Sequence, residues 1–539
     1  MRIGQTILAL SPELALLIGA CVVLMVGVIG RGRRDRLAAP TALLFALAAL
    51  VLAVLADPDH LGTVDSRELL PGLWLNSLTH YTRLIALTFG SVAILVNWSQ
   101  PVARERGEYM AMILLSLLGV LLTASANDWV VLFLSIELVS IPTYIMIALS
   151  RTESRASESA VKYFFLGALS AAILAYGISF LYGATGTTTI TLFLQSETET
   201  SMQFASGFPA TAVIGIVLVF AGLSFKIAAV PFHVYAADVY EGAASPVTGF
   251  LGFVPKFAGF LALIKVLAAI GWQLPPALFW MLWIVAAVTM TTGNVLGLLQ
   301  RNVKRTLAYS SIAHTGYLLV ALLVGPLAGN AGFMPRGTDA ILFYIAIYGV
   351  MNLGAFAALT ALRTDGRDAE TLEDISGAAR RAPGICLAMA LCVFSLMGFP
   401  PTAGFLAKLY VLGGAFSFDS GDAMYRPMIA LAIIVAVNSA MAAAYYLRIV
   451  AAIYFGASTT KLAPEGGNAP KWALAACALP MLFIFVRPEG LTSFAKRSAG
   501  VVHAITLDAR HTLTTQADQP TDANTSVELA GDHVPTIHP

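Results

Sequence analysis

The chain has 539 residues, of which 58% are apolar and only 12% are charged, and its formal net charge is +1. A soluble domain carries about 25% charged residues, so this composition excludes an ordinary soluble protein and indicates a polytopic membrane protein. The near-neutral net charge argues against nucleic acid as a partner, and the chain contains neither a G-x-x-x-x-G-K-[ST] loop nor a dinucleotide-binding fingerprint.

Apolar runs of about 20 residues recur along the chain and predict about 14 transmembrane helices, since a helix of that length crosses a bilayer. We therefore expect an all-α polytopic membrane protein. The expected spans are 11–30, 38–56, 79–98, 109–125, 129–149, 159–183, 210–235, 245–270, 277–300, 305–325, 338–362, 384–414, 427–455 and 470–486.

Basic residues are concentrated in every second loop between these spans, beginning with the cluster at 31–36 after the first span. Loops rich in lysine and arginine stay in the cytoplasm, so both termini are expected on the opposite side of the membrane. Arg83, Lys265 and Arg448 lie instead near the ends of expected spans. We expect their long side chains to reach the membrane interface.

The segment 210–233 is long enough to span a bilayer, yet it contains Lys226 and, five residues later, Pro231. A charge at membrane depth costs between about 2.5 and more than 10 kcal/mol, so it is seldom without a function. Proline cannot donate a backbone hydrogen bond and clashes with the carbonyl four residues earlier. The helix should therefore break beside Lys226, leaving free carbonyls and room for water. We interpret this segment as an ion-handling site.

Two further charged side chains lie in neighbouring expected spans. Glu137 is surrounded by apolar residues, and a buried carboxylate needs a partner, for which Lys226 is the natural candidate. Lys256 follows Pro255 near the middle of the span after Lys226. A static ion pair that fixes helix packing is the alternative interpretation, but the proline break beside Lys226 serves no packing purpose. We expect the pair to hold a proton while closed and to release it when the two groups separate.

His314 and Lys408 are the candidates in the later spans. An imidazole changes its charge near neutral pH and suits proton relay, although many buried histidines are only hydrogen-bonded core groups. Lys408 lies seven residues beyond Pro401, in a second interrupted span. With water between them, Lys256, His314 and Lys408 are expected to continue the site sideways near the middle of the membrane.

The fourth to eighth and the ninth to thirteenth spans form two groups of five, which must enter the membrane from opposite faces because five is odd. One span in each group is interrupted, at Pro231 and at 398–401. Paired broken helices indicate inverted repeats with a transport site between them. The expected organisation is an N-terminal three-helix segment at 1–108, a first repeat at 109–271, a second inverted repeat at 272–455, a C-terminal helix at 456–489 and a polar, disordered tail at 490–539.

Four motifs resemble the antiporter-like membrane subunits of respiratory complex I, a superfamily that also includes subunits of cation/proton antiporter complexes and of membrane-bound hydrogenases. They are the stretches 225–233, 238–246, 304–317 and 398–408. Within that family the pattern is similar to subunit N, because subunit M carries a glutamate where Lys408 stands and subunit L has a long lateral C-terminal helix. The main departure is the polar tail, which is longer than expected.

This resemblance implies a proton-translocating membrane subunit of NADH:quinone oxidoreductase in a bacterial inner membrane, with both termini periplasmic. It implies that the proton path consists of Glu137, Lys226, Lys256 and Lys408, and that His314 matches the family's histidine on helix 10. This chain would bind no cofactor itself. NADH, FMN, iron–sulfur clusters and quinone would belong to partner subunits, and the partners would be the other membrane subunits and the lipid bilayer.

Two alternatives stay open at this point. The first is a subunit of a multisubunit cation/proton antiporter with no redox partner, which differs from a complex I subunit more in its partners than in its sequence. The second is a polytopic glycosyltransferase or exporter. That class expects a large extramembrane loop with acidic catalytic residues, whereas all loops between the expected spans are short.

Overall fold

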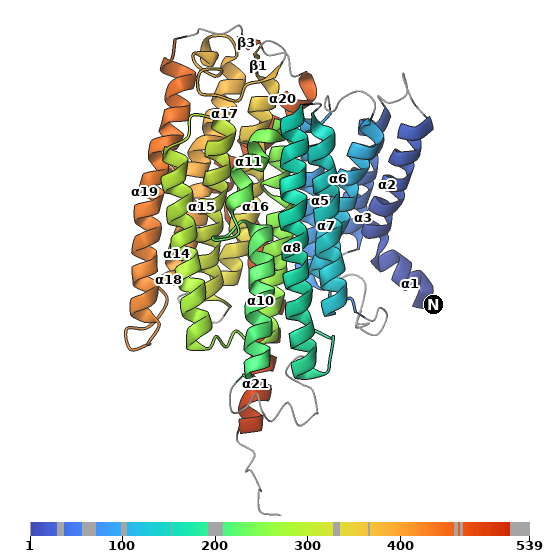
Figure 1. Ribbon diagram of the computed structural model, residues 1–539, viewed down its shortest axis with the longest axis vertical. Helices are drawn as coiled ribbons and strands as arrows, with labels where there is room; N and C mark the ends of the chain where they lie inside the picture. Colours follow the sequence, from blue (N-terminus) through green and yellow to red (C-terminus); the bar gives the residue numbers. More distant parts are fainter. Residues whose placement is uncertain are drawn as a thin grey trace, which may run out of the picture.

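The computed structural model describes residues 2–29, 37–56, 72–98, 105–151, 153–191, 208–326, 335–364, 367–457, 462–463 and 467–517. Almost all of these residues are helical, and Figure 1 shows most of the helices running side by side along one axis. Among them, 13 helices are long and apolar enough to cross a membrane, and two shorter apolar helices follow one another as a further crossing. The prediction of an all-α polytopic fold with about 14 crossings is therefore confirmed.

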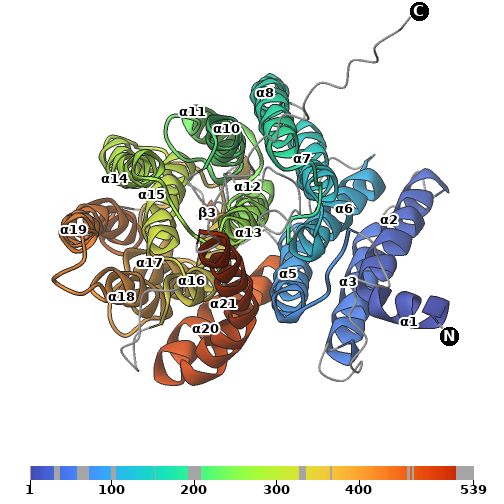
Figure 2. The same ribbon diagram turned by 90° about the horizontal axis from the view of Figure 1, so that it is seen from below.

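The N-terminal helices lie at one edge of the bundle (Figure 2). Their bounds are α1 (Arg2–Ala9), α2 (Ser11–Ile29), α3 (Ala38–Leu55) and α5 (Ser77–Val96). Helix α3 presents a stripe of fully buried alanines that recur every three or four residues, among them Ala42, Ala46 and Ala49. Small residues let two helix backbones approach closely inside a membrane, and this stripe explains why α3 packs along α2.

The next five crossings form the first group. Their helices are α6 (Arg106–Ser125), α7 (Trp129–Ser150), α8 (Ser154–Thr185), α10 (Ala210–Ile227), α11 (Val234–Gly242), α12 (Ser245–Leu251) and α13 (Val254–Ala269). The fourth crossing is broken between α10 and α11, as the proline in that segment predicts. The fifth consists of α12 and α13, joined by two residues.

The second group of five crossings repeats this plan. Its helices are α14 (Pro276–Leu298), α15 (Val303–Val324), α16 (Gly337–Ala361), α17 (Pro383–Met397), α18 (Ala403–Ala415) and α19 (Tyr425–Phe455). The fourth crossing is again the broken one, between α17 and α18.

A small antiparallel sheet marks one end of the bundle, which we call the strand end (Figure 1). It has the strand order β2-β1-β3 and joins β1 (Arg363–Thr364), β2 (Arg367–Asp368) and β3 (Leu462–Ala463). A short 3-10 helix, η2 (Ala378–Arg380), lies between β2 and α17. The opposite end carries α1 and α21 and is called the terminal end.

The two groups run through the bundle in opposite directions. Arg151, directly after α7, forms an ion pair with Glu370 beside the sheet, so α7 ends at the strand end and α6 runs away from it. Helix α16 ends two residues before β1, so α16, and α14 two crossings earlier, run toward the strand end. The opposite polarity is what an inverted repeat requires.

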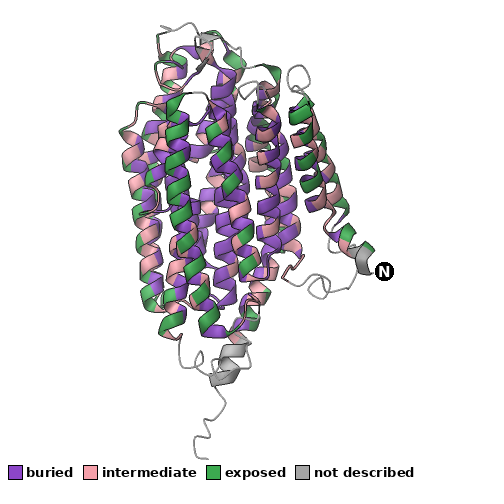
Figure 3. Cartoon of the chain, turned by 45° about the vertical axis from the view of Figure 1, so that its right-hand side comes forward, coloured by how far each residue is buried: buried purple, intermediate pink, exposed green. Residues whose placement is uncertain are grey.

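Three crossings are almost entirely buried, and Figure 3 shows the buried residues concentrated in the interior of the bundle. Buried residues make up 100% of the apolar window in Ser245–Ala269 and 94% in both Val303–Val324 and Gly337–Ala361. A helix that is apolar on all sides belongs in the interior. These central helices also carry most of the polar residues described below.

Two glycines fix the break between α17 and α18. Gly398 has a positive φ of 80°, and a β-carbon there would lie 2.8 Å from Cδ of Lys408. At Gly404 a β-carbon would lie 1.8 Å from the carbonyl oxygen of Ser395, so no larger residue fits. The chain can therefore turn sharply while Lys408 approaches the end of α17.

The prediction of a disordered tail from residue 490 is wrong as far as Ala517. After α20 (Asn468–Val486) the chain forms α21 (Glu489–Ala517), which packs against α5, α13 and α16 across the terminal end (Figure 2). Its buried residues, Ala495, Ala499 and Val502, recur every three or four positions. A face of such small residues gives little hydrophobic signal, and this explains why the sequence reads as polar. Residues 518–539 lie outside the described residues.

Candidate functional site

The site begins with a buried ion pair between α10 and α7. Nζ of Lys226 donates hydrogen bonds to Oε1 of Glu137 at 2.9 Å and to Oγ of Ser140 at 2.7 Å. The Lys226 side chain is 3% exposed and that of Glu137 is 17% exposed. The structure thus brings together the two residues that the sequence analysis paired. Ser140 is an additional partner that the sequence analysis missed, although it lies one helical turn after Glu137.

The chain breaks directly after Lys226. Helix α10 ends at Ile227, and Ala228 adopts the left-handed conformation with φ 55°. The carbonyl of Ile227 accepts a hydrogen bond from Oγ1 of Thr315 at 2.7 Å, and that of Phe225 accepts one from the hydroxyl of Tyr235 at 2.8 Å. The expected break is confirmed. These two carbonyls are nevertheless occupied by side-chain hydroxyls rather than free, because neighbouring helices supply donors.

Lys256 lies in the first turn of α13, at the centre of the bundle. Its Nζ donates to the carbonyl of Ser311 at 2.5 Å and to Oγ1 of Thr315 at 2.9 Å, and the side chain is buried. Among the described residues no carboxylate lies within ion-pair distance of this ammonium. Thr315 contacts both this ammonium and the carbonyl of Ile227, the neighbour of Lys226. One threonine therefore joins the two lysine sites.

A small cavity lies between the two lysines. Its volume is about 10 Å³, and Lys226, Lys256, Tyr235, Tyr240 and Ser311 are among the residues that line it. A polar space of this size is close to the minimum for a single water molecule. One water can therefore bridge the lysines, and no more than one fits without movement of the walls.

His314 lies on α15 and is held by two tyrosines. Its Nδ1 lies 2.6 Å from the hydroxyl of Tyr344, and its Nε2 lies 3.2 Å from the hydroxyl of Tyr446. The hydroxyl of Tyr446 also bonds with Oγ of Ser310. A neutral imidazole has one donor and one acceptor nitrogen, and each hydroxyl can match either role. The histidine can therefore change its tautomer without losing a partner.

Lys408 closes the row in the second broken crossing. Its Nζ donates to the carbonyl of Met397, the last residue of α17, at 2.7 Å. The same nitrogen lies 5.2 Å from the ring centroid of Tyr317, and the His314 ring lies 5.7 Å from that ring. Tyr317 therefore stands between His314 and Lys408. The Lys408 side chain is buried, and no carboxylate of the described residues pairs with it.

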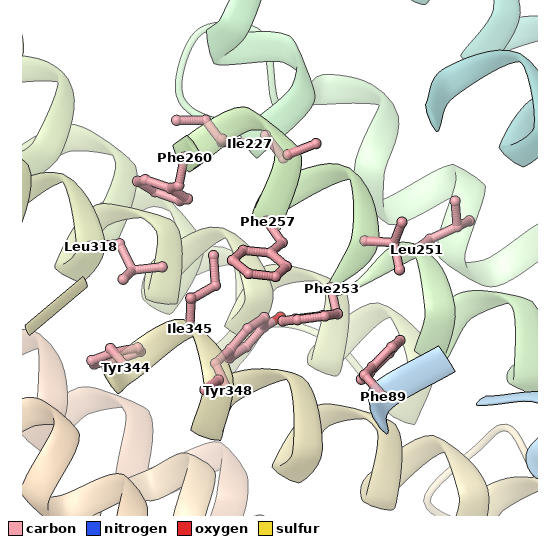
Figure 4. Packing of buried hydrophobic residues seen from close by; sticks show 14 of the residues in the cluster. Phe89, Ile227, Leu251, Phe253, Phe257, Phe260, Leu318, Tyr344, Ile345 and Tyr348 are labelled. Atoms are coloured by element: carbon pink, nitrogen blue, oxygen red, sulfur yellow. The ribbon is translucent and has the colours of Figure 1, made fainter. Parts of the chain in front are cut away.

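Together these groups form a continuous row, from Glu137 and Lys226 through Lys256 and His314 to Lys408, that we call the polar row. Intervening side chains link successive members, as Thr315 does between Lys256 and the carbonyl of Ile227 beside Lys226. Between Lys256 and His314 the linking side chain is Tyr348, whose ring lies 5.8 Å from Nζ of Lys256 and 5.0 Å from the His314 ring. Both Tyr348 and Tyr344 belong to α16, and Figure 4 shows them among the packed side chains around Phe253 and Phe257.

A second cluster of charges lies at the strand end. Arg305 donates to Asp238 at 3.0 Å and to Glu241 at 2.6 Å. Both acids lie on α11. Their contact with Arg305 fixes the outer half of the broken crossing to α15.

Glu370 is the centre of the same cluster. It forms ion pairs with Arg151 and, at 3.1 Å, with Lys304. Burial alone would raise the pKa of the Glu370 carboxyl, but Lys304 and Arg151 hold this pKa below its usual value. The carboxylate is therefore charged at neutral pH, and it joins the end of α7 to the start of α15.

The three basic residues expected at the membrane interface differ in outcome. Lys265 donates to the carbonyl of Ala126 at the terminal end, and Arg448 donates to the carbonyl of Gln300 at the strand end. Arg83 is 1% exposed and is paired with Glu13 inside the N-terminal segment. The expectation for Arg83 is wrong because the sequence does not show that α2 and α5 come together.

Comparison with known proteins places the chain among related sequences and folds. Residues 126–447 match the family described as "NADH:quinone oxidoreductase/Mrp antiporter, TM". The NADH-quinone oxidoreductase subunit N of Azorhizobium caulinodans is 35% identical over 494 residues, covering 91% of this chain and 97% of that relative. A chain of respiratory complex I from Thermus thermophilus with bound aureothin has a TM-score of 0.73 at 27% identity, covering 89% of this chain and 98% of that chain. A chain of the Mrp complex from Dietzia sp. DQ12-45-1b has a TM-score of 0.75 at 19% identity, covering 94% and 99%, and shares the fold.

Proposed function

Because this chain belongs to the NADH:quinone oxidoreductase/Mrp antiporter transmembrane family, we propose that it is a proton-translocating membrane subunit of an NADH:quinone oxidoreductase. The observation that carries this proposal is the polar row, in which titratable groups follow one another across the buried centre of the molecule. In this proposal NADH, FMN, iron–sulfur clusters and quinone are bound by partner subunits, and quinone reduction in those subunits supplies the energy.

The closed pair of Glu137 and Lys226 is the first proton holder in this mechanism. While the carboxylate lies 2.9 Å from Nζ, it stabilises the protonated lysine. When the pair separates, the buried ammonium loses that stabilisation, and the proton can pass through the single-water space to Lys256. Each charge that crosses against the membrane potential stores about 2.3 kcal/mol per 100 mV, so the opening must be driven from outside this chain.

The second half of the row works without carboxylates. Lys256 and Lys408 are held by backbone carbonyls and hydroxyls, which accept hydrogen bonds but carry no compensating charge. A proton on either lysine is therefore held weakly and is easily displaced. His314, between them, can accept a proton on one ring nitrogen and release one from the other. This arrangement favours the transfer of a proton along the row over its retention on one residue.

We further propose that the strand end faces the cytoplasm and the terminal end faces the periplasm of a bacterial inner membrane. The support is the concentration of arginine at the strand end, including Arg151, Arg301, Arg305 and Arg363. Accessible cysteines introduced at Glu489 and at Glu373, on opposite ends, test the orientation. A membrane-impermeant thiol reagent added to intact cells should label the Glu489→Cys variant only.

Purification of the tagged chain in mild detergent from its own membranes tests the assignment to a redox complex. We expect it to come with subunits that give flavin and iron–sulfur absorption and that oxidise NADH in a reaction sensitive to quinone-site inhibitors. A colourless complex of small membrane subunits without NADH oxidation would contradict the proposal. It would assign the chain to a cation/proton antiporter, the other branch of this family.

Replacing Thr315 by valine tests the link between the two lysines. The variant keeps the shape of the side chain but leaves the Ile227 carbonyl and the Lys256 ammonium each short of a partner, at a cost of about 1–3 kcal/mol. We expect proton translocation in proteoliposomes to fall about tenfold while the complex still assembles. Thr360→Val is the matched control, because the hydroxyl of Thr360 donates to the carbonyl of Phe356 in its own helix and to no other group of the described residues. Equal translocation by both variants would show that Thr315 has no part in transfer.

A further inference from the structure

An apolar cavity lies away from the polar row, between α5, α16 and α20. Its volume is about 270 Å³, and its walls are formed almost entirely by apolar side chains, with Ile347 of α16 and Pro480 of α20 among them. The rings of Phe89 and Phe253, which lie side by side in Figure 4, also line it. Leu491 of α21 is a further lining residue. A cavity lined this way does not hold water.

The position of the cavity matches one leaflet of the bilayer. Leu491 lies at the start of α21 at the terminal end, while the residues of α16 that line the cavity, 346–353, lie in the middle third of that helix. The cavity therefore runs from the membrane surface to about the middle of the bundle.

The cavity is open toward the surroundings of the bundle. Thr88 of α5 and Ala476 of α20 line it and are exposed. Pro480 interrupts the hydrogen bonding of α20 at this level, since proline has no amide hydrogen. On the outer side of the same helix, Leu479 and Phe483 are more than half exposed, as expected for side chains that face lipid. Hydrocarbon therefore has direct access to the opening between α5 and α20.

Basic side chains lie close along the chain to Leu491, the cavity residue at the membrane surface. Arg487, Lys496 and Arg497 are exposed and lie within two helical turns of Leu491, whereas Glu489 is the one exposed acid on that stretch of the described chain. Lysine and arginine at a membrane surface attract anionic lipid headgroups. The charge at the opening therefore complements a phosphate, and the interior complements a hydrocarbon chain.

We propose that this cavity binds one acyl chain of an anionic phospholipid from the leaflet at the terminal end, with the lipid phosphate held by Arg487 and Lys496. The bound chain would press on Phe253. The centroid of its ring lies 4.2 Å from that of Phe89, with the rings tilted by 38°, and the ring packs so closely on Gly349 that a β-carbon there would lie 2.5 Å away. Phe253 is the last residue before α13, which carries Lys256 in its first turn. The lipid therefore supports the segment that positions the central lysine.

Photolabelling of the intact complex in lipid nanodiscs tests this site. The probes are phosphatidylglycerol and phosphatidylcholine that carry the same diazirine acyl chain, and the readout is the yield of labelled peptides from 84–92 and 476–484. We expect the yield of these labelled peptides to be higher with phosphatidylglycerol than with phosphatidylcholine, by about fivefold for each basic side chain that contacts the phosphate. Arg487→Gln together with Lys496→Gln should bring the two lipids to equal yield.

Ala476→Phe fills the cavity and should abolish labelling at 84–92, whereas Leu479→Phe, on the lipid-facing side of the same helix, should leave it unchanged. Equal labelling of the unaltered complex by both lipids would overturn the assignment of the headgroup, and this comparison needs no variant. Absence of labelling by either lipid would overturn the proposal. Loss of labelling on addition of a long-chain quinone would identify an isoprenoid tail, and not a phospholipid chain, as the occupant.

Discussion

Replacing Lys226 by methionine is expected to reduce proton translocation by about tenfold or more, a change of at least ~1.4 kcal/mol in the barrier, because methionine can neither accept nor release a proton. The variant removes the ammonium that contacts Glu137 and Ser140, so the first proton-binding group of the row is lost. The measurement is the acidification of proteoliposomes during NADH oxidation, expressed per quinone reduced. Lys471→Met, at the start of α20 and outside the polar row, should translocate protons as the unaltered protein does.

The variant Lys226→Arg distinguishes two roles for Lys226, that of a proton carrier and that of a partner in a purely structural ion pair. Arginine keeps the positive charge and the contact with Glu137, but it does not release its proton at any pH that the protein meets. If Lys226 carries protons, the arginine variant should assemble normally and fail to translocate. Normal translocation by Lys226→Arg would mean that the pair only holds α7 and α10 together, and the proposed mechanism would then be wrong.

Replacing Arg83 by methionine is expected to be the most destabilising change in the N-terminal segment. The guanidinium of Arg83 donates two hydrogen bonds to Glu13, at 2.8 and 2.9 Å, and one to the carbonyl of Ala9. Its loss leaves a buried carboxylate without a partner, at a cost of about 3–5 kcal/mol. We expect a clear fall in the thermal unfolding temperature of the purified complex, or failure of the chain to assemble.

The double variant Glu13→Leu with Arg83→Met identifies the cause. A buried ion pair replaced by apolar residues of similar size is often neutral in stability, so the double variant should recover most of the loss. Arg155→Met is the control, because the Arg155 side chain is 69% exposed and its pairing with Glu241 at 3.9 Å contributes little. A double variant no more stable than Arg83→Met alone would show that packing, rather than the uncompensated charge, determines the effect.

The charged members of the polar row could be predicted because a charge inside an apolar run has few physical explanations. Lys226 and Glu137 each need a partner, and proximity in the same group of helices suggested one. The break after Ile227 could be predicted from Pro231 alone, since proline cannot continue the hydrogen bonding of a helix.

The hydroxyl groups between the charges could not be predicted in the same way. Thr123 and Thr360 bond to the carbonyl four residues earlier in their own helices, as threonine commonly does in an apolar helix. Thr315 makes this bond too, yet it also reaches Ile227 on another helix. No local pattern distinguishes these cases, because the difference depends on which helix is the neighbour.

Helix α21 illustrates a different limit. Its contact face consists of alanine and other small residues. Such residues contribute little to the mean hydropathy of a segment, so the face gives only a weak apolar pattern. Such a helix is stabilised by the surface on which it packs, and the sequence of the helix alone does not show that this surface exists. The composition is polar, but the disorder predicted from it is wrong.

The enclosure of α13, α15 and α16 has a consequence for leakage. A membrane that stores energy as a proton gradient loses it wherever water forms a continuous path for protons across the hydrocarbon. With the central crossings 94–100% buried, the surrounding helices act as an insulating layer around the polar row. The outer helices that carry no member of the polar row need only remain apolar and continuous, whereas a polar replacement that admits water between two of them would open a path for protons without touching any proton-carrying residue.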